Sequence, residues 1–417
     1  MSGHDVAVTG LGLLTPAGIG VGDTWEGVRA GRSTATADPE LAGLPVEFSC
    51  RLPDVDIDAR LGRRLSRRVD RFSAMALIAA REAVADAGLG EPWHAEAEGR
   101  EADWDPDRVA VLLGVGSNSL ATYPEEFGRL NEERPDRVSP LALTRSVPNF
   151  AASEVSTDLG AAGPSMAIST ACSSGAMALG TARSLIESGA CDVVIAGGSE
   201  SARAAMTAAC FAQMRALSQR GDEPERASRP FDAERDGFVL GEGAGILVLE
   251  RAEHARARSA RVYARLTGFG ASCDAYHVVA PRPDGEGIVG ATRAALADSG
   301  WEPQDVGHIN AHATSTRLND RAEAHALHRL FGTPPPVTAT KSVIGHSLGA
   351  AGAIEAATTV LSVHYGTIPP TANLDTLDED IDLDVVTGKE RGTWAPTALS
   401  NSFGFGGQNA VLAFEGP

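Results

Sequence analysis

The chain has 417 residues, of which 43% are hydrophobic and only 5% aromatic, with 36 basic and 55 acidic side chains. That length exceeds what one ordinary hydrophobic core organises, so it predicts two domains or a duplicated architecture. The formal net charge of −19 argues against a general nucleic-acid-binding protein, because contact with phosphates needs a basic surface, although a local basic patch remains compatible with it.

The start of the chain and its cysteines indicate a cytoplasmic protein. Met1 leads directly into a strand-like run without the cationic flank and apolar segment of a signal peptide. No apolar run is long enough to span a bilayer, so we expect no membrane association. The five cysteines show neither CxxC nor metal-ligand spacing, which predicts no disulfide framework and no metal site: Cys50, Cys172, Cys191, Cys210 and Cys273.

The pattern of residues 6–15 predicts a strand, and that of residues 20–31 predicts a short helix. The chain from there to about residue 55 is predicted to be irregular, because Gly and Pro interrupt it. The first run begins like a dinucleotide-binding fold. The third glycine of GxGxxG falls on Thr15, however, so we reject that interpretation.

Six arginines then recur at helical spacing, at positions i, i+3, i+4, i+7, i+8 and i+11 from Arg60 to Arg71. This spacing predicts one cationic face on a helix. Like charges in this arrangement weaken a helix by about 0.3 kcal/mol per pair, which favours an anionic partner. The alternative is a solvated face partly neutralised by carboxylates such as Asp70.

Strands and helices alternate through the rest of the first half. A helix is predicted at residues 72–87, ended by Gly88, and followed by an acidic surface insertion at 91–107. Strands are predicted at 108–115, before Cys172, at 192–198 and at 241–250, with a helix at 175–186. Cys172 therefore falls at a helix N-terminus, where the dipole favours a thiolate. The alternative is a buried cysteine that acts as a small hydrophobic residue.

The second half repeats features of the first in the same order. Residues 80–88 recur at 292–300, residues 173–176 at 347–350, and residues 243–250 at 407–415. These echoes predict an internal duplication whose halves meet near residue 255. Alternating strands and helices predict α/β layers, with a site where strand ends of the two halves meet.

Two histidines share the setting of Cys172. His312 and His346 each lie between a predicted strand and a predicted helix. Lys341 precedes His346 closely, and Lys389 is the only other lysine in a chain that otherwise uses arginine. A lysine retained here indicates a need for a compact ammonium group.

A serine hydrolase is the competing interpretation, because residues 345–349 match the GxSxG nucleophile elbow around Ser347. After Ser347, His364 is the only histidine, and Glu355 is the only acid before it. All three fall on one predicted helix, which excludes a triad.

Five motifs in order resemble those of elongating β-ketoacyl-acyl-carrier-protein synthases of the thiolase superfamily, over nearly the whole chain: residues 170–175, 229–244, 310–316, 341–346 and 401–407. The resemblance implies an α/β, thiolase-like duplicated αβαβα five-layer fold. It implies an N-terminal half, 1–255, carrying the nucleophilic Cys, and a C-terminal half, 256–417, carrying both catalytic His. It also implies an acyltransferase without a cofactor or metal of its own.

The resemblance implies a role for each matching residue. Cys172 takes the acyl chain from a carrier thioester, while His312 and His346 stabilise the enolate formed as the malonyl unit loses carbon dioxide. The backbone N–H groups of Cys172 and Phe405 form a second oxyanion hole. The residues that orient the histidines are Lys341, Asp320 and Glu355. Thr314 and Thr316 hold the phosphopantetheine arm. Phe403 and Phe405 gate the acyl pocket.

The implied partners are an acyl carrier protein and a second ketosynthase-like subunit, in a homodimer or in a heterodimer with a chain length factor. Carrier proteins are acidic and this chain is also acidic, so a local basic patch must receive one. The candidate docking residues are Arg63, Arg64, Arg67, Arg68, Arg215 and Arg220.

Two pathways are compatible with the motifs. Residues 316–323, 345–350 and 369–374 look like the ketosynthase subunit of type II polyketide systems, whereas residues 171–174 and 310–316 look closer to fatty-acid enzymes. We favour the polyketide role. A non-catalytic chain-length subunit disagrees with the retained Cys172, and a degradative thiolase needs a second cysteine near the C-terminus, where none follows Cys273.

Overall fold

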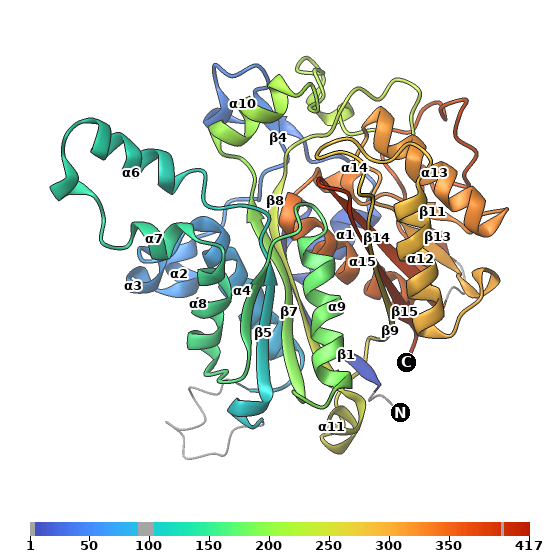
Figure 1. The fold of residues 1–417 in the computed structure, drawn as a ribbon, viewed down its shortest axis with the longest axis horizontal. Coiled ribbons are helices and arrows are strands. Elements are labelled where there is room, and N and C mark those ends of the chain that lie inside the picture. Colours follow the sequence, from blue (N-terminus) through green and yellow to red (C-terminus); the bar gives the residue numbers. More distant parts are fainter. Residues whose placement is uncertain (1–4, 91–103, 393–395) are drawn as a thin grey trace.

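The computed structural model describes residues 5–90, 104–392 and 396–417. Within these residues one mixed sheet dominates (Figure 1). Its strands are β1 (Val6–Thr15), β2 (Gly18–Ile19), β5 (Val109–Gly114), β6 (Ser165–Ile168), β7 (Val193–Ser201), β8 (Glu242–Arg251), β9 (Ala264–Cys273), β10 (His308–Asn310), β11 (Val337–Thr338), β14 (Thr397–Gly404) and β15 (Gln408–Glu415). Two small separate sheets pair β3 (Thr36–Ala37) with β4 (Phe48–Ser49), and β12 (Thr367–Ile368) with β13 (Arg391–Gly392).

The strand order shows the duplication directly. The path β6-β5-β7-β8-β1 continues as β9-β15-β14-β10-β11, so each half of the sheet has the same order, read outward from the centre. β5 pairs in parallel with β6 and β7, as β10 does with β11 and β14. β8 runs antiparallel to β7 and β1, as β15 does to β14 and β9.

Helices cover the outer faces of both halves and fill the layer between them. α4 (Arg71–Asp86) and α8 (Asn149–Leu159) pack outside the first half, and α12 (Glu286–Ser299) and α13 (Arg317–Phe331) outside the second. α9 (Ser174–Glu187) and α15 (Ala351–Tyr365) form the middle layer. Leu112 of β5 packs inward against this layer, whereas Val111 and Leu113 pack outward against α4 and α8, as the period of two in a strand requires.

Close packing of helix on sheet depends on glycine at equivalent places. A Cβ on Gly12 of β1 would lie 1.9 Å from the carbonyl oxygen of Ala79 in α4. A Cβ on Gly270 of β9 would lie 1.9 Å from the carbonyl oxygen of Ala291 in α12. The two halves therefore also share the close contact between sheet and first outer helix, which is α4 in the first half and α12 in the second.

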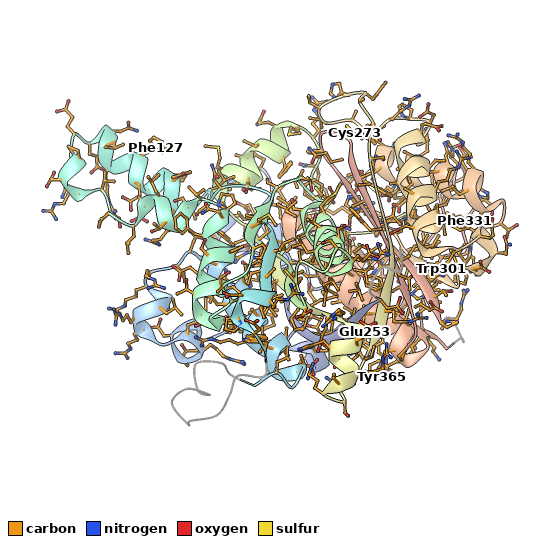
Figure 2. All side chains as sticks on the ribbon, turned by 60° about the horizontal axis from the view of Figure 1, so that its bottom comes forward. Phe127, Glu253, Cys273, Trp301, Phe331 and Tyr365 are labelled. Carbon is orange, nitrogen blue, oxygen red and sulfur yellow. The ribbon has the colours of Figure 1, made fainter. Side chains whose placement is uncertain are left out.

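The remaining helices connect or flank this framework. α6 (Thr122–Asn131) and α7 (Ala142–Ser146) form an arm that stands away from the body, and Phe127 lies on this arm (Figure 2). No helix in the described ranges is long and apolar enough to cross a membrane. These remaining helices are α1 (Val21–Arg29), α2 (Ile57–Leu61), α3 (Arg63–Ser66), α6 (Thr122–Asn131), α7 (Ala142–Ser146), α10 (Ala205–Gln213), α11 (Ala252–Ala257) and α14 (Lys341–Ile344), with short 3-10 turns at 39–41, 106–108, 135–137, 224–226, 303–305 and 348–350.

The single cationic helix face predicted over residues 60–71 is wrong. Gly62, with φ of 79°, ends α2, and α3 has only four residues before the chain turns again ahead of α4. Arg71 extends inward instead, and its guanidinium nitrogens lie 2.7 and 2.8 Å from the buried carboxylate of Glu242. The other predicted strands and helices of the first half are present within a few residues. Most of the predicted insertion at 91–107 lies outside the described residues.

Candidate active site

Cys172 lies in the turn between β6 and α9, with only 6% of its surface exposed. Ala171 before it has φ of 50°, a left-handed conformation that turns the chain sharply into the helix. The hydroxyl of Ser174 braces this turn, since it accepts from the N–H of Thr170 at 2.9 Å and donates to the carbonyl of Ala171 at 2.6 Å. The predicted strand–Cys–helix arrangement is therefore confirmed.

The protonation state of Cys172 differs from the prediction. Burial raises the pKa of the thiol to about 11, although the charge of Lys341 and the N–H of Phe405, which donates to the sulfur, act in the opposite direction. Desolvation of the thiolate outweighs these stabilising groups. The group is therefore a thiol at neutral pH, and its reaction requires a proton acceptor.

His312 follows β10 and belongs to a buried chain of polar groups. The ammonium of Lys341 lies 3.2 Å from Nδ1 of His312 and also donates to the carboxylate of Glu355 on α15. Because an ammonium has only donors, Nδ1 accepts and the neutral ring carries its proton on Nε2. Burial and the charge of Lys341 hold the pKa of His312 well below its usual value, so the ring stays neutral.

His346 faces His312 from the segment between α14 and α15. The centroids of the two rings lie 5.5 Å apart with the rings nearly perpendicular, and the ring of Phe238 packs edge-on against His346 at 5.3 Å. The backbone N–H of His346 donates to the carbonyl of Val239 at 2.8 Å, which ties it to the first half of the chain. Burial, with the charge of Lys341, also lowers the pKa of His346 well below its usual value. Nδ1 of this ring contacts no hydrogen-bond partner among the described residues, so no neighbour fixes its tautomer.

The sequence predicted that Asp320 of α13 orients the histidines, but Glu323 of the same helix contacts His312 instead. Asp320 contacts neither histidine, because its carboxylate accepts from the N–H of Phe231 at 2.9 Å and lies 3.5 Å from Nε of Arg235. Glu323, which we did not predict, accepts from the N–H groups of His312 and Ala313 at 2.9 and 2.8 Å. Its signal was the spacing of three residues from Asp320, which places both acids on one helix face. Burial raises the pKa of Glu323 and, to about 7, that of Glu355.

One cavity of about 340 Å³ brings the predicted side chains together. Cys172, His312 and His346 line its inner part. Thr314 and Thr316, whose hydroxyls lie 2.9 Å apart, line the path outward. Phe403, near the end of β14, and Phe405, just after that strand, also line the cavity.

The loop after β14 approaches Cys172 closely. A Cβ on Gly404 would lie 2.5 Å from the carbonyl oxygen of Thr170 and 3.2 Å from the backbone nitrogen of Cys172. Only glycine therefore lets the N–H of Phe405 reach the sulfur. No group of three or more His, Cys, Asp or Glu side chains in the described ranges has metal-binding geometry.

The six predicted docking arginines lie in two groups. Arg63, Arg64 and Arg67 are exposed on α3 and the turn after it, and Arg68 there is ion-paired with Glu154. Arg215 and Arg220 follow α10, and Arg220 lies 3.2 Å from the carboxylate of Glu234. Arg215 lines the cavity of Cys172, and the other five are not among its lining residues.

Sequence comparisons match both parts of the chain to one protein family. The N-terminal domain of β-ketoacyl synthases matches residues 3–255, and their C-terminal domain matches residues 263–375. The chain is 40% identical over 415 residues to 3-oxoacyl-[acyl-carrier-protein] synthase 2 of Synechocystis sp., covering 98% of this chain and 97% of the relative. It is 41% identical over 415 residues to the Staphylococcus aureus protein of the same name, covering 98% of each.

Solved structures show the same likeness. The ishigamide ketosynthase/chain length factor matches with a TM-score of 0.92 and 32% identity over 100% of both chains. A type II polyketide ketosynthase in complex with its acyl carrier protein matches with a TM-score of 0.90 and 31% identity, again over 100% of both chains. The predicted thiolase-like α/β fold is confirmed. The chain therefore belongs to the β-ketoacyl synthase family of acyltransferases.

Proposed function

We propose that the chain joins an acyl group held on Cys172 to a malonyl unit held on an acyl carrier protein, in a decarboxylative Claisen condensation. One observation carries this proposal: a buried thiol and two neutral imidazoles line one cavity, and a lysine fixes one imidazole as an Nε2–H donor. We divide the chain accordingly into a half at 1–255 that supplies the thiol and a half at 256–417 that supplies both histidines.

In the first half-reaction, the sulfur of Cys172 attacks the carbonyl of an acyl thioester on the carrier arm. His312 cannot take the thiol proton on Nε2, because that nitrogen already carries a hydrogen. Nδ1 of His346 has no hydrogen-bond partner among the residues that the structure describes, so this histidine takes the proton and returns it to the departing arm thiolate. The N–H groups of Cys172 and Phe405 stabilise the tetrahedral oxyanion.

In the second half-reaction, the malonyl thioester loses carbon dioxide and becomes an enolate. His312 donates from Nε2 to the enolate oxygen, and His346 donates from its own ring N–H after changing tautomer. The enolate carbon attacks the acyl carbonyl, the carbon–sulfur bond to Cys172 breaks, and the thiolate takes a proton from solvent. Glu355 and Glu323 act by positioning, through Lys341 and the backbone of His312 respectively.

The substrates reach the site on the phosphopantetheine arm of the carrier, so the enzyme needs no cofactor of its own. Thr314 and Thr316 hold this arm, and Phe403 and Phe405 gate the acyl pocket. The partner subunit covers helices α6 and α7, on which the apolar side chains of Phe127, Leu130 and Leu143 are exposed. A cytoplasmic location fits these soluble substrates.

We propose type II polyketide synthesis as the pathway. The motif at residues 316–323 supports it, as do the structural likenesses to a type II polyketide ketosynthase and to a ketosynthase/chain length factor. Housekeeping fatty-acid elongation is the second candidate. It is favoured by the 40% identity, over 98% of this chain, to a 3-oxoacyl-acyl-carrier-protein synthase.

Incubation of the purified protein with malonyl-carrier protein and a series of acyl-carriers tests the proposal, with mass spectrometry of the products. We expect an acyl adduct on Cys172 and a carrier-bound β-keto product two carbons longer. Addition of a candidate chain length factor distinguishes the pathways: dependence on that subunit, with repeated extension, supports the polyketide role. Single extensions by the protein alone support fatty-acid elongation, and no adduct with any carrier contradicts the proposed function.

Charge reversal of Arg67 and Arg68 tests the carrier-docking proposal. The double variant R67E/R68E is expected to lower the association rate of carrier protein at low salt by about 10-fold, because two attractive charges become repulsive. The matched control is R256E/R261E, two exposed arginines on α11 and after it. Stopped-flow association across a salt series measures the effect. An unchanged rate and salt dependence in R67E/R68E would remove the α3 group from the docking surface.

A further inference from the structure

Two arginines at the mouth of the active-site cavity differ from most others in the chain. Ion pairs engage most of the arginines that the structure describes, both buried and exposed. Arg215 and Arg317 are exposed, line the cavity that contains Cys172, and form no ion pair within residues 5–90, 104–392 and 396–417. In a chain with a net charge of −19, two free guanidinium groups at one entrance indicate a site for an anion.

Backbone hydrogen bonds place the two arginines on adjoining walls of the entrance. The N–H of Phe238 donates to the carbonyl of Ala216 at 2.9 Å, and the N–H of Gly237 donates to the carbonyl of Ser315 at 3.2 Å. The segment at 237–238 therefore bridges the residue after Arg215 to the segment that leads into α13. The two walls are in direct contact at Gly237, because a Cβ there would lie only 2.4 Å from the backbone of Leu217.

Arg317 is held in place by the fully buried Arg235. Nη2 of Arg235 donates to the carbonyl of Arg317 at 3.2 Å, and Nε of Arg317 donates back to the carbonyl of Arg235 at 3.3 Å. Asp378, at 2.6 Å, and Asp320, at 3.5 Å, neutralise Arg235. This arrangement orders Arg317 through Nε alone, and no described residue accepts from its two Nη groups. Asp320 thus supports the entrance rather than the histidines.

The other polar groups at the entrance are compatible with an anion. His277 accepts at Nδ1 from the N–H groups of Val279 and Ala280, at 3.0 Å each, so its neutral ring presents an Nε2–H donor. Two acids line the cavity, and other groups already donate to both. Asp236 accepts from the hydroxyl of Ser218 at 2.6 Å and the N–H of Gln219 at 2.9 Å. Asp274 accepts from the N–H of Arg282 at 2.9 Å and the side-chain amide of Asn409 at 2.8 Å.

We propose that Arg317, assisted by Arg215 and His277, binds the phosphodiester that joins the pantetheine arm to the carrier protein. The planar fork of a guanidinium matches two phosphate oxygens. Thr314 and Thr316 line the same cavity, and exposure falls from Arg317 through Thr316 to the buried Thr314, so a phosphate held at Arg317 directs the arm past both threonines toward Cys172. This inference rests on the proposed function and names the part of its substrate that the entrance recognises.

Binding of 4′-phosphopantetheine and of pantetheine, measured by calorimetry, tests the phosphate site independently of catalysis. We expect Arg317→Gln to weaken phosphopantetheine binding by about 10- to 100-fold, because a charge-assisted bond to phosphate is lost. Pantetheine binding is expected to stay unchanged. Arg321→Gln is the matched control: Arg321 lies one turn later on α13, is exposed, pairs with Asp380 and does not line the cavity.

In the condensation assay, R317Q is expected to raise KM for malonyl-carrier protein while kcat changes little. Equal weakening of phosphopantetheine and pantetheine, or of neither, would overturn the phosphate site. Coenzyme A, measured in the same way, gives the other overturning result: weaker binding of coenzyme A by R317Q with unchanged binding of phosphopantetheine would assign Arg317 to a nucleotide phosphate. Failure of the wild-type protein to form any acyl adduct would instead contradict the proposed function, while the binding comparison would still decide the phosphate site.

Discussion

Cys172→Ala is expected to lower condensation on the order of 10⁴-fold or more, because the acyl group then has no nucleophile to carry it. Decarboxylation of malonyl-carrier protein is expected to persist, since His312, His346 and Lys341 keep their contacts with one another. Intact-mass analysis after incubation with acyl-carrier protein measures the adduct, and release of carbon dioxide measures the second activity.

Cys210→Ala is the matched control for this variant. Cys210 is a free, exposed cysteine on α10, outside the lining of the cavity, and its loss is expected to leave the acyl adduct in place. An acyl adduct that survives in C172A would show that another group is the nucleophile. Loss of decarboxylation together with condensation would show that the thiol also takes part in the malonyl step.

Lys341→Met is expected to lower condensation by about 10²- to 10³-fold and to move the acidic limb of the rate–pH profile upward. The charge of Lys341 helps to hold the pKa of His312 below its usual value, so its removal raises that pKa. His312 then becomes an imidazolium at a higher pH than in the wild type. The pKa of Glu355, already about 7 through burial, rises further once its cationic partner is gone, so this carboxyl is protonated at neutral pH.

Lys389→Met provides the comparison, because Lys389 is exposed and is the only other lysine in the chain. It is expected to match the wild type at every pH. The decisive measurement is kcat between pH 5 and 9 for both variants, alongside thermal unfolding to show that each is folded. A K341M profile with an unmoved acidic limb would mean that Lys341 does not set the protonation of His312.

The sequence determined the elements that depend on local pattern. Alternating hydrophobic runs located β5, β7 and β8, and three repeated segments predicted a duplication that the strand order reproduces. The setting of Cys172, His312 and His346 between strands and helices predicted that they meet, and all three line one cavity. These inferences succeeded because strand periodicity and residue order are properties of the chain itself.

Tertiary structure decided the properties that depend on what surrounds each group. Desolvation raises the pKa of Cys172 to about 11 against the prediction from its helix terminus, because burial is invisible in a local pattern. Asp320 and Glu323 lie three residues apart on one helix, and only the packing of α13 selects Glu323 for the backbone of His312. Gly62 has a positive φ and ends α2, so the expected helix over residues 60–71 does not form and Arg71 points inward to Glu242. Charge, solvation and hydrogen bonding between distant residues are set by the folded contacts, so residue spacing alone could not fix them.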